Sequence, residues 1–523
     1  MSGDNRPGPR TRIRSSHLLE RARRMASDPP PGNAVGDLVA DFSVEEVAER
    51  RGLPVATVRG IRTFYDQIEK LTRVCSGTAC TFGGAHALRE RLEGLGPVGE
   101  VRCLGHCYAT PAFRSGEKVY ACPPHERVED WLDEWGEGPS PMADLSPMPR
   151  LSLTAEPVVL RHLLRGAEGG ADSPWSEYET PDPDTILANV EAAQVRGRGG
   201  AAFPTATKWR TARNTLADTK YVVANGDEGD PGSYVDRLLL EEDPHTVLAG
   251  MLACARVIGA TRGIVYIRAE YPQAQRSMRR AIEQARARGV LGAAFDVSVY
   301  TGAGSYVCGE ENALLRSIEG LRGEPSPKPP FPAEAGLFGK PTVVQNVETL
   351  ALIPWAARHA RPTGTKAVCV SGAVARPGII EVPLGMSVRE ILQRGAGGAA
   401  PGRTWRMALV GGPMGRVLPE AQFDTPLSYE ALPGMGHGGI VVLDDTVTPR
   451  ALAEHLFEFA RGESCGNCTP CRVGTSRLAQ IRDVATMERL LTTMEEGSLC
   501  GFGSTVPKPV RDLLRHFGQE ALR

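Results

Sequence analysis

The C-terminal part of the chain carries four cysteines at a spacing that suits metal chemistry. Cys465, Cys468 and Cys471 recur at three-residue intervals in the run Glu-Ser-Cys-Gly-Asn-Cys-Thr-Pro-Cys-Arg, and Cys500 follows later. An iron–sulfur cube takes four thiolates, commonly three close together and one remote. Structural zinc more often takes two separated Cys-x-x-Cys pairs, and free cysteines usually lie singly in apolar cores. The spacing predicts a [4Fe-4S] cluster, with zinc as the alternative.

A second cysteine group lies near the other end of the chain. Cys75 and Cys80 are separated by four residues, and after 22 more residues Cys103 and Cys107 follow in Cys-Leu-Gly-His-Cys. Two pairs from two loops suit a [2Fe-2S] cluster in which each pair holds one iron. Paired cysteines also suit zinc, so zinc is a stronger alternative here than for the later group. His106 is not expected to be a ligand, because four thiolates are available.

Three glycine-rich or acidic segments suggest a nucleotide site. Residues 197–209 begin Gly-Arg-Gly-Gly, whose backbone N–H groups could wrap a phosphate. Residues 225–232 place three carboxylates in one loop, either as a solvated turn or as acceptors for ribose or flavin groups. Residues 302–311 follow an expected strand and open a helix, as phosphate sites do, but their glycines lack the G-x-G-x-x-G spacing. The two glutamates that end this segment favour NAD over NADP on grounds of charge.

Composition places the chain among ordinary globular proteins. It has 523 residues, of which 41% are hydrophobic and 23% charged, so three or four domains are expected. A net charge of −2 gives no basic field for nucleic acid. The longest apolar runs are far too short to span a membrane, so any membrane contact would go through partner subunits. Eight of the twelve cysteines fall in the two groups, which indicates metal and a reducing cytoplasm.

Alternating strand and helix patterns organise the middle of the chain. Strands are expected at 221–225, 263–268 and 295–300, with helices at 184–195, 246–258 and 273–288, which indicates a parallel sheet covered by helices. Residues 365–443 change to a small α+β pattern, and the chain from 449 onward is expected to be helical. The first 24 residues contain seven arginines and two acidic residues, so we expect a disordered basic arm rather than a transit peptide.

The motifs together resemble a known family. The Gly-Arg-Gly-Gly-Ala-Ala-Phe-Pro-Thr segment, Asp-Glu-Gly-Asp-Pro-Gly, Gly-Ser-Tyr-Val-Cys-Gly-Glu-Glu, Lys-Pro-Pro-Phe-Pro, Asn-Val-Glu-Thr-Leu and the Cys-Thr-Pro-Cys run resemble the flavin-bearing NADH-binding subunit of respiratory complex I. They also resemble the diaphorase subunits of NAD-dependent formate dehydrogenases and NAD-reducing hydrogenases. The N-terminal third resembles the thioredoxin-like [2Fe-2S] subunit of the same complexes, here fused in one chain.

The resemblance implies a multidomain α/β fold. The expected parts are the basic arm (1–35), short helices with a thioredoxin-like ferredoxin domain (36–135), a linker (136–150), a Rossmann-like FMN/NADH domain (151–362), a β-grasp domain (363–445) and a C-terminal helical bundle that holds the [4Fe-4S] cluster (446–523).

The same resemblance implies the cofactors, FMN and NAD(H), and the residues that would bind them. FMN would lie among Gly197, Arg198, Gly199, Gly200, Lys208, Asn225, Asp227, Glu228, Tyr306, Gly309, Glu310 and Asn346. NADH would lie among Phe203, Lys208, Asp230, Glu311, Lys328 and Phe331.

Three departures bear on which branch of the family the chain resembles. Asp230 stands where complex I members usually have glutamate, and Gln345 stands where they have a second asparagine before Asn346. The 28 residues between Cys471 and Cys500 are also fewer than in complex I members. These features favour the formate dehydrogenase or hydrogenase branch.

The expected activity is a diaphorase that transfers hydride between NAD(H) and FMN, then single electrons through clusters to or from a partner subunit. A flavin can connect two-electron and one-electron chemistry, and no side chain is needed as a general base. By the resemblance, the [2Fe-2S] cluster would be a side store. The alternatives are the complex I NADH-dehydrogenase subunit, a thioredoxin-like thiol oxidoreductase, which the cysteine spacings oppose, and a zinc-stabilised nucleotide-binding regulator.

Overall fold

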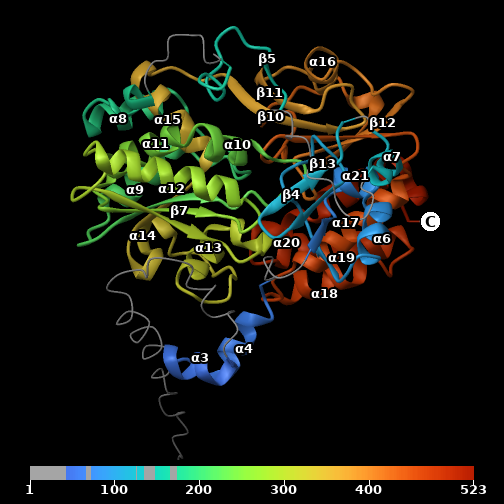
Figure 1. The fold of residues 1–523 in the computed structure, drawn as a ribbon, viewed down its shortest axis with the longest axis horizontal. Coiled ribbons are helices and arrows are strands. Elements are labelled where there is room, and N and C mark those ends of the chain that lie inside the picture. Colours follow the sequence, from blue (N-terminus) through green and yellow to red (C-terminus); the bar gives the residue numbers. More distant parts are fainter. Residues whose placement is uncertain (1–42, 66–71, 125, 135–147, 165–173, 523) are drawn as a thin grey trace, which may run out of the picture.

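The computed structural model describes residues 43–65, 72–124, 126–134, 148–164 and 174–522. The basic arm predicted at 1–35 lies outside these residues, as does most of the linker predicted at 136–150. Within the described part of the chain, none of the helices combines the length and the apolar character needed to cross a membrane. Figure 1 shows three sheets with helices packed around them.

The centre of the molecule is a four-stranded, fully parallel sheet in the order β8-β7-β6-β9. Its strands are β6 (Tyr221–Gly226), β7 (Arg262–Ile267), β8 (Asp296–Thr301) and β9 (Thr342–Asn346). The three strands expected from the sequence are therefore confirmed to within about one residue.

Helices cover both faces of this sheet. In Figure 1 one face carries α8 (Pro183–Ala192), α9 (Thr205–Asn214), α10 (Val235–Glu242), α11 (Pro244–Ile258), α12 (Pro272–Ala287) and α15 (Val347–His359), and the other carries α13 (Glu311–Ile318) and α14 (Pro332–Ala335). Alternate residues of β6 belong to different cores: Val222 and Ala224 pack with the first layer, Tyr221 and Val223 with the second. This is the side-chain alternation of a strand that is buried on both faces.

Helix α11 is apolar on nearly all sides because it is enclosed by its neighbours. Its Gly250 lies against α15, where a Cβ would come within 2.1 Å of the Leu350 carbonyl oxygen. Only glycine permits this close crossing, so the pair α11–α15 forms a rigid layer behind the sheet.

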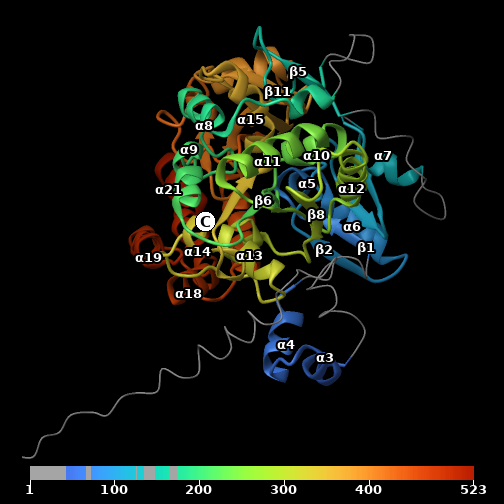
Figure 2. The same cartoon turned by 90° about the vertical axis from the view of Figure 1, so that its left-hand side faces the viewer.

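The N-terminal part contains a separate mixed sheet in the order β2-β1-β3-β4. Its elements are β1 (Thr72–Cys75), β2 (Val98–Val101), β3 (Ala112–Ser115), β4 (Lys118–Ala121), α5 (Thr78–Phe82), α6 (Ala85–Glu93) and α7 (Val128–Asp133). Two short helices, α3 (Val44–Arg51) and α4 (Val55–Arg62), lie apart from this sheet in Figure 2. The capping box predicted at Ser43 and Glu46 is present, and the Tyr65 hydroxyl donates to the Leu321 carbonyl (2.8 Å).

The third sheet is six-stranded, in the order β13-β12-β14-β10-β11-β5. Its strands are β5 (Arg150–Ser152), β10 (Thr365–Gly372), β11 (Gly378–Pro383), β12 (Trp405–Val410), β13 (Arg416–Pro419) and β14 (Gly439–Asp444). The helix expected at 387–394 is formed by α16 (Val388–Glu390) and a π turn (Ile391–Gly395). Strand β5 comes from the segment before the central domain and pairs with β11 in parallel.

The C-terminal residues form a helical bundle, as expected. Its helices are α17 (Pro449–Glu463), α18 (Thr469–Leu478), α19 (Val484–Gly497), α20 (Gly501–Thr505) and α21 (Pro507–Phe517). Short 3₁₀ helices complete the described structure at Pro174–Tyr178, Tyr306–Gly309, Leu337–Gly339, Glu420–Gln422 and Gly518–Ala521.

Candidate functional site

The glycine-rich loop before α9 closes on itself and packs against the end of β9. The Gly197 N–H donates to the Phe203 carbonyl (2.9 Å), and Gly200 has a φ of +123°, a value suited to glycine. A Cβ on Gly199 would lie 3.2 Å from the Cβ of Asn346. The loop therefore needs its small residues to approach the carboxyl end of the sheet, where open α/β sheets bind ligands.

Arg198 is a buried cation with spare donors. Its backbone N–H donates to the Thr349 hydroxyl (2.8 Å), and one guanidinium nitrogen donates to Thr363 (3.1 Å). Its Nε and Nη1 are buried and have no hydrogen-bond partner. A buried guanidinium with unused donors is costly unless an anion satisfies it, so this side chain fits the phosphate of the expected FMN.

The loop after β6 supplies a matching acceptor. Asn225 donates from Nδ2 to the Gly309 carbonyl (2.8 Å) and accepts from the Asp227 N–H (3.1 Å), which joins the ends of β6 and β8. Asp227 Oδ2 is buried without a partner. Burial raises the pKa of Asp227 well above its usual value, against the opposing charge of Arg268. An unpaired buried carboxyl suits the hydroxyl donors of a polyol chain such as that of FMN.

Glu228 is engaged by the protein through both its carboxylate and its carbonyl. The carboxylate accepts from the Ser233 hydroxyl (2.6 Å) and from the N–H groups of Asp236 (3.1 Å) and Arg237 (3.0 Å) at the start of α10. Its carbonyl accepts from Arg268 (2.6 Å). Burial raises the pKa of Glu228 above its usual value. In this geometry the side chain holds the shape of the loop.

Asp236 was not predicted, but it orients a residue that was. Its Oδ2 accepts from Asn346 Nδ2 (2.6 Å), and its Oδ1 accepts from the Glu348 N–H (3.0 Å). Because one donor of Asn346 is fixed in this way, the face of its amide toward the glycine-rich loop is also fixed.

Two lysine–glutamate pairs lie at the mouth of the site. Lys208 Nζ contacts Glu311 Oε2 (3.0 Å), and Lys328 Nζ contacts both Glu310 Oε1 (3.0 Å) and Glu311 Oε1 (2.7 Å). Burial works against ionisation of Glu311, but the two lysines outweigh it and lower its pKa. Because both glutamates are paired with cations, the charge argument for NAD over NADP is weaker than the sequence suggested.

Two aromatic rings at the same rim are unusually exposed. Phe203 is 49% exposed and Phe331 is 52% exposed. Exposed rings beside paired charges are suited to stacking against a planar ligand, and these two were predicted to line the NADH site.

Tyr306 links the flavin loop to the rest of the site. Its hydroxyl donates to Asp230 Oδ1 (2.6 Å), and its ring packs against Phe459 and Phe502 of the C-terminal bundle. Its backbone N–H donates to Glu463 Oε2 (3.2 Å). The loop that follows β8 is thus bonded directly to the segment that precedes the cluster cysteines.

The first cysteine set lies buried against the loop after β6. The Cys103 and Cys107 sulfurs are 3.7 Å apart. The sulfurs of Cys103 and Cys80 both lie close enough to Cys75 to raise its thiol pKa. Gly232, in the acidic loop, donates its N–H to Cys107 Sγ (3.3 Å). The four thiols meet as predicted, and the neighbouring loop supplies an N–H···S contact to one of them.

The second cysteine set lies at the starts of α18 and α20. Cys471 interacts electrostatically with Cys468, Cys500 and Cys465, and burial raises the pKa of Cys471 to about 12. The Ser464 hydroxyl lies 3.4 Å from Cys471 Sγ, and the backbone N–H before Cys500 donates to Cys468 Sγ (3.5 Å). Among the described residues, no group of three or more His, Cys, Asp or Glu side chains is arranged to hold a metal ion.

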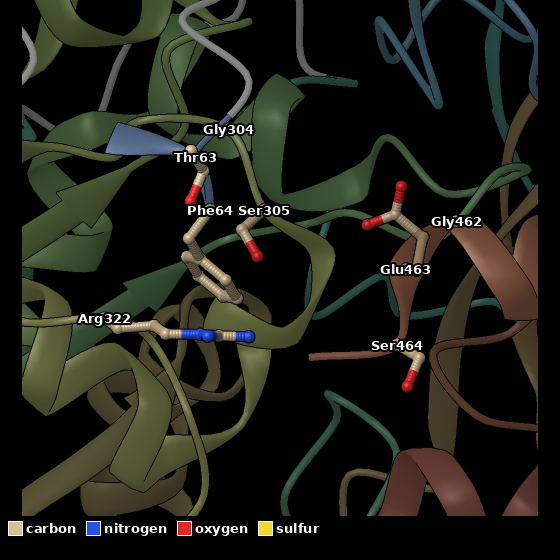
Figure 3. Close-up of a pocket in the computed structure, with 8 residues that line it drawn as sticks. All are labelled: Thr63, Phe64, Gly304, Ser305, Arg322, Gly462, Glu463 and Ser464. Carbon is tan, nitrogen blue, oxygen red and sulfur yellow. The ribbon is translucent and has the colours of Figure 1, made fainter. Parts of the chain in front are cut away.

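A polar cavity of about 270 Å³ separates the flavin loop from the segment before this second set (Figure 3). In Figure 3 the Arg322 guanidinium lies beside the Phe64 ring, with Glu463 and Ser464 on the opposite wall. The lining residues are Thr63, Phe64, Gly304, Ser305, Arg322, Gly462, Glu463 and Ser464.

Sequence reasoning missed three further residues of the site. Arg102 Nε contacts Glu463 Oε1 (3.3 Å), which joins the residue before Cys103 to the residue two before Cys465. His437, in the third sheet's domain, lies against Asp230. The only local signals are a charged residue beside a cysteine and a histidine flanked by glycines.

These features define a class of protein: an iron–sulfur flavoprotein that joins a nucleotide-binding α/β domain to a ferredoxin-like domain, a β-grasp domain and a helical cluster domain. Family models agree with each part. The Nuo51 FMN-binding domain matches 190–355, the SLBB domain 367–418, the NADH-ubiquinone oxidoreductase-F iron–sulfur binding region 451–523, and the thioredoxin-like [2Fe-2S] ferredoxin 34–136.

Curated relatives and solved structures give the same assignment. The chain is 42% identical to HndC of the NADP-reducing hydrogenase of Solidesulfovibrio fructosivorans, over 68% of this chain and 78% of that protein. It is 38% identical to a second form of the F component of the NADH-quinone oxidoreductase of Rhizobium meliloti, over 70% and 96%. A chain of an air-oxidized NAD⁺-reducing [NiFe]-hydrogenase superposes with a TM-score of 0.81, at 31% identity and over 96% and 94%. The chain belongs to the family that contains HndC and the F components of NADH-quinone oxidoreductases, and the predicted cofactor domains are confirmed.

Proposed function

We propose that this chain is the diaphorase subunit of a multisubunit enzyme and exchanges hydride with NAD(H). FMN would accept the hydride and release electrons one at a time to iron–sulfur clusters, which are one-electron carriers. The chain's own residues would bind the two cofactors, press the nicotinamide against the flavin and keep water out of the contact.

The observation that carries the proposal is the hydrogen bond from the Tyr306 N–H to Glu463 (3.2 Å). It places the loop after β8, which belongs to the FMN-binding domain, directly beside the segment that leads into Cys465. A nucleotide site and a cluster site held in contact by backbone and carboxylate are suited to electron transfer between them.

The residues of the site divide into three roles. Arg198 and Asp227 offer the unused buried donor and acceptor that would hold the phosphate and polyol of FMN. The rim, with Lys208, Lys328 and the exposed ring of Phe331, would hold the nucleotide. Hydrogen-bond donors and acceptors fixed by the sheet would orient both without proton transfer to a side chain.

Within the family, the proposal favours the hydrogenase or formate dehydrogenase type of complex over respiratory complex I. The support is the fused N-terminal ferredoxin-like domain, the hydrogenase relative, and a hydrogenase chain that matches nearly the whole of this one. The partners would be further electron-transfer subunits. A cytoplasmic location, with membrane contact only through partners, remains part of the proposal.

Anaerobic titration of the purified chain with NADH tests this function. We expect stoichiometric NADH to bleach a flavin band together with broad iron–sulfur absorbance. NADPH should be run in parallel, because the paired glutamates leave the nucleotide preference open to measurement.

Two outcomes would contradict parts of the proposal. A colourless protein with bound zinc would favour the zinc-stabilised regulator. Flavin bleaching with the clusters left oxidised would keep the nucleotide site but refute electron transfer to the clusters.

A further inference from the structure

His437 is carried into the nucleotide site by a glycine-rich loop of the β-grasp domain. The loop precedes β14, and its glycines at 434, 436 and 438 have φ values of +100°, +55° and +88°. Such a run of left-handed residues needs glycine. Because the backbone turns so tightly on both sides of His437, the imidazole is held at a fixed position, and it is only 9% exposed.

Backbone contacts fix which nitrogen of His437 carries a proton. Its Nδ1 accepts the N–H of Gly439 (3.1 Å). Burial lowers the pKa of His437, against the opposing charge of Asp230, so the ring is neutral. A neutral imidazole has one protonated nitrogen, which must then be Nε2.

That Nε2–H faces the carboxylate of Asp230. The distance from His437 Nε2 to Asp230 Oδ2 is 3.3 Å. The two groups are close but not aligned as a full hydrogen bond, and Nε2 has no other partner. The other oxygen of Asp230 accepts from the Tyr306 hydroxyl (2.6 Å). Asp230 therefore lies between a donor from the flavin loop and a donor from the β-grasp domain.

The surrounding chain leaves room for nothing larger at this contact. A Cβ on Gly412, in the turn after β12, would lie 3.0 Å from both Asp230 Oδ1 and His437 Nε2. Two glycine-rich turns of the same domain thus converge on one carboxylate, which is the arrangement of a built site and not of a surface contact.

We propose that His437 is a positioning residue for the nucleotide site: its Nε2–H holds the Asp230 carboxylate in the orientation in which the other oxygen binds Tyr306. The inference depends on the proposed function, because it assigns the β-grasp domain a direct part in binding NAD(H). A hydrogen bond to a charged group commonly contributes enough to change a binding constant about tenfold.

The test compares three variants of the full chain. His437→Ala removes the donor, whereas His437→Gln places an amide N–H near the position of Nε2. His86→Ala is the matched control, since that imidazole is exposed and lies in the N-terminal domain. We would measure KM and kcat for NADH with ferricyanide, and the Kd for NAD⁺ by calorimetry on the oxidised protein.

We expect His437→Ala to raise KM and Kd about tenfold, with kcat changed far less, and His437→Gln to restore most of the affinity. In an Asp230→Ala background, His437→Ala should have little further effect, because the two residues act as one unit. Equal KM and Kd for wild type and His437→Ala would overturn the inference, as would equal losses in the Ala and Gln variants with a lowered melting temperature. A wild-type protein that NADH cannot reduce would refute the proposed function instead.

Discussion

Replacing Glu381 with alanine is expected to weaken the junction between the central domain and the β-grasp sheet by about 3–5 kcal/mol. Its carboxylate is fully buried in β11. It accepts the N–H groups of Val158 (2.7 Å), Val159 (3.1 Å) and Leu160 (2.8 Å), and the Thr365 hydroxyl (2.7 Å). Alanine would leave these donors buried without partners, and each unsatisfied donor costs about 1–3 kcal/mol.

Hydrogen exchange is the suitable measurement, because a multidomain chain does not unfold in a single two-state step. We expect the amides at 158–160 to exchange at least about a hundredfold faster in Glu381→Ala, since local opening becomes easier by the energy lost. Glu381→Gln should lie between, because one acceptor oxygen remains and the new amide donor faces other donors.

Glu454→Ala is the matched control for this prediction. Glu454 forms an exposed pair with Arg450 on α17, and such pairs contribute at most about 1 kcal/mol. It should leave exchange at 158–160 unchanged. Unaltered exchange in Glu381→Ala would show that the four hydrogen bonds do not hold the junction.

The elements of the central sheet could be predicted because their signals are local. Strand β7 is bounded by turns and apolar throughout, and α11 begins at a proline and ends at Gly259 in a left-handed conformation. The cysteine ligands were also predictable, because their spacing alone restricts what they can bind. Each of these patterns lies within about twenty residues of sequence.

The contacts that were not predicted join distant segments. Arg102 and Glu463 are 361 residues apart, and Glu381 accepts from a backbone more than 220 residues earlier. No periodicity connects such positions, so only the folded arrangement reveals them. A weak signal existed at Glu381, a charged residue inside an otherwise apolar strand, because a buried charge requires partners.

Replacing Cys471 with alanine is expected to separate hydride chemistry from electron delivery. Cys471 is the most buried of the four cysteines in the bundle, and it lies in the first turn of α18 among the other three. A [4Fe-4S] cluster held by three thiolates and a methyl group loses a ligand that no neighbouring side chain replaces with equal strength. We expect the iron content to fall from about six to about two atoms per chain, which is the content of the remaining [2Fe-2S] cluster.

The consequences for electron flow follow from the positions of the two cysteine sets. NADH should still bleach the flavin band of Cys471→Ala, because Arg198, Asp227 and the rim residues are untouched. Reduction of the partner protein should drop to background. Cys103→Ala is the matched comparison: it removes the other cluster, leaves about four iron atoms, and should preserve most delivery if that cluster is a side store.

The experiment combines iron analysis, NADH titration and electron paramagnetic resonance of both variants. Loss of metal can also loosen the bundle, because cluster binding and folding are coupled. Flavin bleaching serves as the internal check, since Tyr306 packs against Phe459 and Phe502 of the same bundle and would report a collapse. Full partner reduction by Cys471→Ala would contradict the path through the C-terminal cluster. Lost delivery in Cys103→Ala, with its second cluster intact, would instead place the N-terminal cluster on the main path.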